Sequence, residues 1–262
     1  KMNTVMPRLG AGLKDYLPAE MIVRQRMLDT IRSVFERFGF LPLDTPCIEL
    51  EEILTGGDPN FNKQIFRTGL RGGSEGLALR FDLTVPLARV VAQYRDKLPR
   101  PFKRYQIGKV FRGEKPQAGR FREFVQFDAD IVGCADPIAD AEIIALIYET
   151  MAALRIGNFT VKVNNRKVLN GLSDFVGFPT ADMTAILRLI DKIENLGWDN
   201  VSGELKDQYS FSPDQLARLK DFIDFRGGDQ RETVAGIRKL MTDSMIARDG
   251  MDELDEIIRN VE

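Results

Sequence analysis

The sequence predicts an α+β fold in which an antiparallel sheet is flanked by helices and followed by a C-terminal helical subdomain. Three observations lead to this prediction. Short strand-like segments alternate with amphipathic helices in the first part of the chain, and two long strand candidates are joined by a polar turn. From Arg166 onward only helical periodicity is present. We therefore expect a core domain over residues 1–165 and a helical subdomain over 166–262.

The first expected element is a long helix. Apolar residues recur at helical spacing over 19–38, and Gly39 follows as a natural C-terminal stop. Residues 41–50 then predict a short strand. Because this strand contains Pro42 and Pro46, we expect it at a sheet edge or an interface.

Glycine and polar residues then mark loops at 55–64 and 69–76. Strands are expected at 64–68, between these loops, and at 76–81. A helix follows at 83–96, with a proline in its first turn.

A hairpin is the clearest prediction. Two strand candidates, 103–114 and 121–133, are separated by the turn sequence KPQAGR. Alternation in the second strand places four side chains on one face: Phe124, Gln126, Asp128 and Asp130.

Beyond the hairpin, Asp136-Pro137 predicts a helix start, and 159–165 reads as a last strand. The helical region that follows is expected to break at four places: Phe178-Pro179, Ser212-Pro213, Gly227-Gly228 and Gly250.

Composition limits the classes of function. The chain has 262 residues, 44% of them hydrophobic and 29% charged, with a net charge of -2, as in an ordinary soluble domain. No apolar run is long enough to span a bilayer, and the first residues do not resemble a signal peptide. Cys47 and Cys134 lie in apolar segments and are expected to be buried and reduced. A cytoplasmic protein is therefore expected.

The chain contains no histidine. This absence excludes, within the chain, histidine general bases, Ser-His-Asp and Cys-His systems, and metal sites that use histidine. The remaining chemistry belongs to carboxylates, arginines, lysines and backbone dipoles, with bound magnesium where a nucleotide carries it.

Arginines gather near the end of the hairpin, on strands that also carry Phe124, Gln126 and Asp130. Arginine grips phosphate oxygens bidentately, and acidic side chains beside an aromatic ring suit a polar ligand. The hairpin end is therefore either a site for phosphate and a small molecule or a solvated charged rim.

Residues 111–133, FRGEKPQAGRFREFVQFDADIVG, resemble the motif 2 hairpin of class II aminoacyl-tRNA synthetases in its histidine-specific form. Other segments resemble the same family in order. Residues 9–18 resemble its N-terminal segment, and 38–46 resemble motif 1, whose proline, here Pro46, lies at the dimer interface. Residues 78–89 resemble the segment that receives the amino acid, and 156–172 the approach to a helical insertion. The resemblance implies a class II synthetase-type antiparallel sheet.

The resemblance also implies roles in ATP binding. Arg112 matches the arginine that bridges the substrate carboxylate and the ATP α-phosphate, where a fixed guanidinium stabilises developing charge. Glu114 matches the acidic residue near the adenine amino group, and Arg120 matches a loop arginine that reaches the phosphates. Phe124 is placed to stack under adenine, unless it is a core phenylalanine. Mg²⁺ would be bound with the ATP.

Histidine binding is implied for another set of residues. Asp82, Thr84 and Gln126 match groups that hold the α-ammonium, although Asp82 or Thr84 alone would also suit a helix cap. Asp130 matches the carboxylate that accepts an imidazole N–H. A buried hydrogen-bonding group of this kind discriminates against amino acids that lack the N–H donor by a factor of about 10⁴–10⁵.

The implied reaction joins histidine to tRNA(His) through a histidyl-adenylate in a homodimeric enzyme. Lys103, Arg104 and Lys115 are candidates for phosphate contacts to the tRNA acceptor strand. The family's second histidine-binding segment, motif 3 and anticodon-binding domain are not found in the chain. We therefore expect a truncated protein that is weakly active or inactive alone. The alternative is a regulatory or histidine-binding paralogue.

Overall fold

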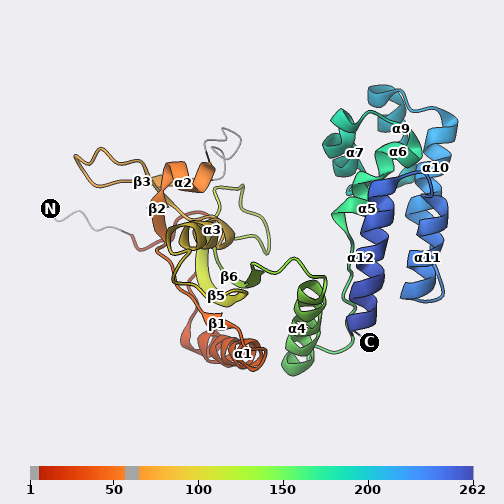
Figure 1. Ribbon diagram of the computed structural model, residues 1–262. Coiled ribbons are helices and arrows are strands. Elements are labelled where there is room, and N and C mark those ends of the chain that lie inside the picture. Colours follow the sequence, from red (N-terminus) through yellow and green to blue (C-terminus); the bar gives the residue numbers. More distant parts are fainter. Residues whose placement is uncertain (1–5, 57–64, 262) are drawn as a thin grey trace. The chain divides into compact units, whose positions relative to one another are not determined.

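A computed structural model describes residues 6–56 and 65–261, which form two compact units (Figure 1). The first unit contains the described residues up to 135 together with 146–159. The second contains 136–145 and the described residues from 160 onward. Most of the loop predicted at 55–64 lies outside the described residues.

The first unit contains two small sheets of three strands each. One has the order β1-β5-β6 and consists of β1 (Leu41–Pro42), β5 (Phe102–Phe111) and β6 (Glu123–Val132). The other has the order β2-β4-β3 and consists of β2 (Ile48–Leu50), β4 (Leu77–Leu79) and β3 (Phe66–Thr68). Strand β1 pairs parallel to β5, and the other pairs are antiparallel. The antiparallel α+β fold is confirmed.

The single strand predicted at 41–50 is wrong, because β1 and β2 are edge strands of different sheets. Pro42 and Pro46 have no N–H to donate to a ladder, so the chain leaves one sheet between them and joins the other. The expected edge position is confirmed for Pro42 in β1, whereas Pro46 lies in the connection between the two sheets.

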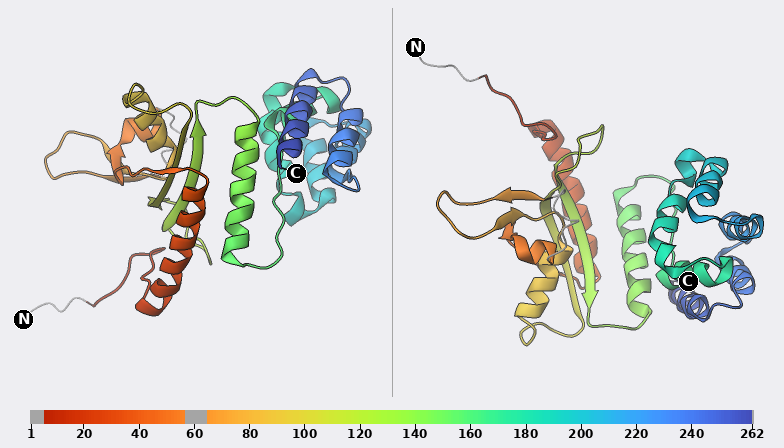
Figure 2. Two further views of the ribbon diagram at one scale, coloured as in Figure 1. Left: turned by 60° about the horizontal axis from the view of Figure 1, so that its bottom comes forward. Right: turned by 90° about the horizontal axis from the view of Figure 1, so that it is seen from above.

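The predicted hairpin is confirmed as the longest paired segment of this unit (Figure 2). Its register runs from Phe102 opposite Val132 to Phe111 opposite Glu123. A bridge between Gln117 and Arg120 closes the turn. Even-numbered residues of both strands therefore share one face of the sheet.

Helix α1 (Pro18–Arg37) confirms the first predicted element, and Gly39 follows it with a φ of 78°. The helix contacts the odd-numbered face of β5. The ring of Phe35 lies 5.7 Å from that of Tyr105, and the Tyr105 hydroxyl donates to Glu36 at 2.7 Å. This face is therefore structural, and the even-numbered face is left for the site.

Two shorter helices, α2 (Glu51–Thr55) and α3 (Thr84–Gln93), complete the described core of the first unit. Helix α4 (Ile138–Leu154) contributes residues to both units, and the N–H of Ile138 donates to Asp136 at 2.9 Å as the cap signal predicted.

The second unit is helical apart from its connections. Its helices are α5 (Arg166–Asn170), α6 (Leu172–Val176), η2 (Thr180–Asp182), α7 (Met183–Ile190), α8 (Ile193–Leu196), α9 (Trp198–Tyr209), α10 (Pro213–Asp224), α11 (Gln230–Leu240) and α12 (Met245–Val261). Their core includes five fully buried side chains: Leu172, Ile186, Val201, Leu205 and Leu219. Ser212 caps α10 in a capping box, so the break predicted there is confirmed.

Two predicted features of this region are wrong. Residues 159–165 form no strand, because alternation records only a propensity and a strand also needs a neighbour to bond with. Gly250 does not end a helix but lies buried inside α12. A Cβ there would lie 2.8 Å from the Val168 nitrogen, so glycine lets α5 and α12 approach closely.

Cys47 is exposed, which contradicts the prediction that it is buried, while Cys134 is partly buried. Cys47 follows Pro46 in the connection between the two sheets, where neither sheet covers it. Among the described residues, helices with the length and apolar character of a membrane span are absent.

Replacing Gly250 with alanine tests the contact between α5 and α12. We expect Gly250→Ala to lower the free energy of unfolding by about 1–3 kcal/mol through overpacking. Gly203→Ala is the matched control, because Gly203 lies in α9 with open space around it. Alanine should stabilise that helix by up to about 1 kcal/mol. Urea unfolding of both variants measures the difference, and equal stabilities would contradict the packing described.

Candidate functional site

Asp82 lies between strand β4 and helix α3. Its Oδ1 accepts a hydrogen bond from the N–H of Val85 at 3.1 Å, so the side chain binds the first turn of α3. Thr84 is exposed at the first position of that helix. The N-cap residue of α3 is Leu83, so Asp82 lies one residue before the capping position, but its hydrogen bond to Val85 still fixes where the carboxylate lies.

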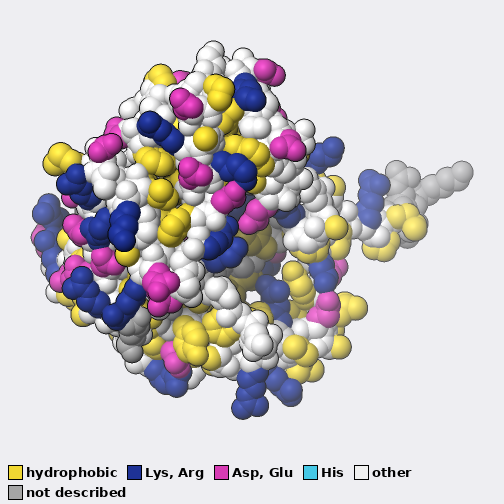
Figure 3. All heavy atoms as spheres, turned by 90° about the vertical axis from the view of Figure 1, so that its right-hand side faces the viewer, with side chains coloured by type: hydrophobic (Ala, Val, Ile, Leu, Met, Phe, Trp, Pro, Cys, Tyr) yellow, Lys and Arg dark blue, Asp and Glu magenta, His cyan; other side chains and the backbone are white. Residues whose placement is uncertain are grey.

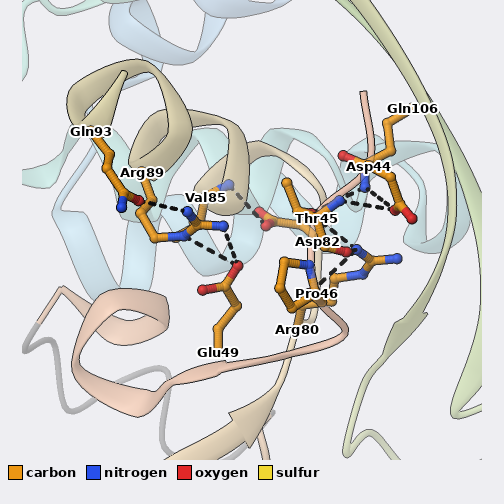
Figure 4. A network of polar contacts seen from close by, with 10 residues as sticks. All are labelled: Asp44, Thr45, Pro46, Glu49, Arg80, Asp82, Val85, Arg89, Gln93 and Gln106. Atoms are coloured by element: carbon orange, nitrogen blue, oxygen red, sulfur yellow. Dashed lines mark hydrogen bonds and ion pairs between the residues drawn. The ribbon is translucent and has the colours of Figure 1, made fainter. Parts of the chain in front are cut away.

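Arg80 holds the segment that carries Asp82 (Figure 4). Its side chain is buried, and Nη1 donates to the Thr45 carbonyl at 2.6 Å and to the Thr45 Oγ1 at 3.1 Å. Its Nε donates to the carbonyl of Lys109 at 2.8 Å. One guanidinium thus joins the segment before α3, strand β5 and the connection that contains Thr45.

Two further side chains in Figure 4, Gln106 and Arg89, hold neighbouring segments together. The Nε2 of Gln106 donates to Thr45 Oγ1 at 3.1 Å and to Asp44 Oδ1 at 3.2 Å. Arg89 on α3 pairs with Glu49 on β2 at 2.7 Å, and the Glu49 side chain is only 7% exposed. Helix α3 is therefore tied to a sheet edge at one end and to Asp82 at the other.

Strand β6 contributes three polar side chains to its even-numbered face. Gln126 Nε2 donates to Asp128 Oδ1 at 2.8 Å. Asp130 is paired directly with Arg104 in the ladder, and Arg104 Nη2 lies 2.5 Å from Asp130 Oδ2. The Arg104 side chain is fully buried. The side chains of Gln126, Asp128 and Asp130 therefore follow one another along β6, and the buried guanidinium of Arg104 lies beside the two carboxylates.

Arg112 connects the hairpin to the Asp82 segment. Its Nε donates to the carbonyl of Phe81 at 3.1 Å, and its guanidinium carbon lies 5.1 Å from the ring centroid of Phe124. One face of the Phe124 ring is thus occupied by Arg112. An adenine stacked on this ring would use the opposite face.

Electrostatic interactions show that these groups form one cluster. Burial raises the pKa of Asp82, and the nearby charge of Asp128 raises it further, while the Val85 N–H and Arg112 oppose the change. Burial also raises the pKa of Asp130, against the effect of Arg104. We call Asp82, Asp128, Asp130, Arg104 and Arg112 the charged cluster. Its carboxylates suit an ammonium or an N–H donor, and the Arg112 guanidinium suits a carboxylate or phosphate.

The hairpin turn contributes less to the charged cluster than the strands do. Glu114 accepts a hydrogen bond from Arg122 Nε through its carbonyl at 3.1 Å, and Arg120 is exposed. In the part of the chain that the structure describes, the side chains of Glu114 and Arg120 make no hydrogen bond or ion pair with the charged cluster. The backbone N–H of Arg122 donates to the carbonyl of Gly12 at 2.8 Å, so the N-terminal segment contacts the hairpin.

Comparison with known proteins identifies the family. The family model described as histidyl-tRNA synthetase matches residues 12–262. The chain belongs to the histidyl-tRNA synthetase family.

Relatives in this family include the histidine–tRNA ligase of Clostridium tetani, 43% identical over 100% of the chain and 59% of the relative. The Wolinella succinogenes histidine–tRNA ligase is 42% identical over 95% of the chain and 57% of its own length. The crystal structure of histidyl-tRNA synthetase from Nostoc sp. PCC 7120 covers 98% of the chain and 58% of that protein, at 33% identity and a TM-score of 0.87. The chain thus spans somewhat more than half of the relatives it matches.

The structure corrects one assignment within this family framework. Arg104 is one of the candidates for phosphate contacts to the acceptor strand, but its side chain is 0% exposed and pairs with Asp130, so it cannot reach a tRNA backbone. Sequence reasoning did not find the roles of Arg80 and Asp128. The directly opposed pair of an arginine and an aspartate in the predicted hairpin was a signal for the buried ion pair.

The approach of Arg80 to β5 depends on a glycine. A Cβ at Gly108 would lie 2.4 Å from Arg80 Nη2, so we expect Gly108→Ala to displace the guanidinium and to destabilise the first unit by about 1–3 kcal/mol. Gly69→Ala is the control, because nothing lies within 4 Å of its added Cβ. Thermal unfolding monitors both variants. An unchanged midpoint for Gly108→Ala would contradict the arrangement of Arg80.

Asp82 is expected to reduce stability at neutral pH. A carboxyl group whose pKa is higher in the folded protein than in the unfolded chain binds its proton more tightly when folded, so its ionisation opposes folding. Asp82→Asn removes this cost and can still accept from Val85. We expect a gain of at most about 1 kcal/mol, because solvent screens a partly exposed charge.

The gain in the free energy of unfolding from Asp82→Asn should be present at neutral pH. It should vanish at low pH, where the wild-type carboxyl is protonated in both the folded and the unfolded state. Urea unfolding at several pH values measures it, with Asp96→Asn as an exposed control. Loss of stability at neutral pH in Asp82→Asn would contradict the prediction.

Proposed function

We propose that the protein to which this chain belongs is a histidine–tRNA ligase, which activates histidine with ATP and transfers it to tRNA(His). The observation that supports this proposal is the charged cluster. In a chain of this family, Asp82, Arg112 and Asp130 come from three separate segments. Asp82 interacts with Arg112, and Asp82 and Asp130 both interact with Asp128 and Arg104 of the β5–β6 hairpin.

In this proposal the amino acid binds across the cluster. Asp82, Thr84 and Gln126 hold the α-ammonium, and Asp130 accepts an imidazole N–H. Arg112 directly follows β5, beyond the Phe111–Glu123 end of the ladder, whereas the Arg104–Asp130 pair lies toward the other end, and this position suits a role between the substrate carboxylate and the ATP α-phosphate.

Glu114, Arg120 and Phe124 are proposed to bind ATP. Glu114 would accept from the adenine amino group, and the exposed Arg120 would reach the phosphates from the turn. Phe124 would stack on adenine with the ring face opposite Arg112.

The first step is an in-line displacement. A carboxylate oxygen of histidine attacks the α-phosphorus of ATP, the bond to the β-phosphate oxygen breaks, and pyrophosphate leaves. Charge builds on the α-phosphate, where the fixed guanidinium of Arg112 stabilises it. In the second step a 3′-terminal ribose hydroxyl of the tRNA attacks the acyl carbon and AMP leaves. Positioning alone supplies up to about 7–11 kcal/mol, so no protein nucleophile is required.

Mg²⁺ is proposed to accompany the ATP. The described residues contain no group of three or more histidine, cysteine or carboxylate side chains suited to a metal ion. We assign the ion to the nucleotide phosphates.

We further propose a homodimer that uses the region around Pro46. Pro46 is exposed there, and Leu41 and Ile48 are 53% and 48% exposed on adjacent edge strands. Such an apolar edge is typical of an interface. The proposed division is a synthetase core over 1–165 and an insertion-like helical subdomain over 166–262, in a cytoplasmic protein. Basic and acidic side chains are mixed on the face drawn in Figure 3, which suits local rather than extended contacts with tRNA.

Histidine-dependent ATP–pyrophosphate exchange by the full gene product tests the function. We expect Arg112→Ala to lower the exchange rate by about 10²–10³-fold, because one stabilising donor at the α-phosphate is lost. Arg95→Ala, an exposed site beyond α3, is the control and should behave as wild type.

Calorimetry separates this function from that of a regulatory histidine-binding protein. The ligase should bind both histidine and ATP, whereas a regulator of that kind should bind histidine alone. Histidine binding without ATP binding or exchange would refute the proposed activity.

A further inference from the structure

A buried cation lies behind the carboxylate proposed to recognise imidazole. Arg104 is 0% exposed, whereas the side chain of Asp130 is 32% exposed. The Asp130 Oδ2 that lies 2.5 Å from Arg104 Nη2 is itself buried. The solvent-exposed surface of the Asp130 side chain therefore belongs to its other atoms. Arg104 contacts the carboxylate from the interior and leaves its other side accessible.

The ion pair has an unusual geometry. Although the two atoms are in contact, Asp130 Oδ2 has no hydrogen-bond partner within the described residues, and neither do Nε and Nη1 of Arg104. Nη2 also donates a long hydrogen bond to the carbonyl of Leu83, at 3.4 Å. Arg104 thus acts on Asp130 mainly through its charge and its position.

The carboxylate of Asp128 lies close to Asp130, so a positive charge is needed to keep both groups ionised. Asp128 Oδ2 lies 3.8 Å from the same Nη2, and its side chain is 15% exposed. Burial raises the pKa of Asp130, Arg104 lowers it, and Asp128 raises it again. The Asp82 carboxylate also interacts with Arg104. Without Arg104, Asp82, Asp128 and Asp130 would lose the cation that interacts with all three of them, while Arg112 interacts with Asp82.

We propose that Arg104 is a positioning residue that determines specificity for the amino acid, because it keeps the Asp130 carboxylate ionised and turned toward the ligand. This inference rests on the proposed function. A neutral carboxylic acid at this position would accept an imidazole N–H weakly and would tolerate amino acids that lack that donor.

The test compares Arg104→Met with Arg104→Lys in the full gene product. The KM for histidine and the kcat of pyrophosphate exchange are measured at neutral and at mildly acidic pH. For Arg104→Met we expect KM to rise about tenfold or more at the acidic end and less as the pH rises, because Asp130 regains its charge. The kcat should change little, since Arg104 does not touch the reacting atoms.

Arg104→Lys keeps the charge and should recover most of the lost affinity. Lys109→Met is the matched control. It removes the cation of another ion pair in the same hairpin, with Glu123, from an odd-numbered position on the opposite face. Its KM should show the wild-type dependence on pH.

Asp128→Asn provides an independent arm if Arg104→Met does not fold. Asparagine can still accept from Gln126, but the negative charge beside Asp130 is gone. We expect this variant to retain histidine affinity to lower pH than wild type does. Added to a folded Arg104→Met, it should restore part of the lost affinity.

A ratio of variant to wild-type KM that is constant across pH in both Arg104→Met and Asp128→Asn would overturn the inference, as would failure of Arg104→Lys to recover any affinity. The proposed function fails separately, when the wild-type protein itself shows no histidine-dependent exchange.

Discussion

The site depends on the antiparallel register of β5 with β6. Because side chains alternate between faces, a slip of one residue would move every polar group of one strand to the face that α1 covers. Arg104 would then lose its position opposite Asp130, and Tyr105 would lose its contacts with Phe35 and Glu36. The aromatic contacts on one face and the ion pair on the other favour the same register. The packing of α1 thus supports the placement of charges on the opposite face of the sheet.

Two buried guanidiniums then organise this face in different ways. Arg80 donates mainly to neutral oxygens of Thr45 and Lys109, so it acts as a connector between segments. Arg104 lies against carboxylates and acts through its charge. Burying a guanidinium is costly unless hydrogen bonds or an opposite charge compensate. In both cases the compensation comes from segments distant in sequence, which ties the position of Asp82 to the folding of the whole unit.

Sequence patterns predicted elements whose signals are local. Helix α1 follows from its periodicity, and the hairpin from alternation around a polar turn. Prediction failed where the outcome depends on a distant partner. Residues 159–165 have the alternation of a strand but no paired neighbour, and Gly250 is a contact point for Val168 rather than a helix end. The family resemblance supplied candidate residues for the site. It did not indicate that Arg104 is buried, because the sequence around an arginine in a strand does not show whether its face of the sheet is exposed to solvent or buried.

The absence of histidine from the chain gives the charged cluster a further meaning. Within this chain no side-chain imidazole is available to Asp82, Asp128 or Asp130, so an imidazole that contacts these carboxylates must come from outside this chain. Burial raises the pKa of Asp82 and of Asp130, and this works against the ionised forms that would bind one. The buried Arg104 counteracts that effect at Asp130 without covering the carboxylate from outside. A cation placed in the interior can therefore stabilise the charge of a binding group and still leave that group open to its ligand.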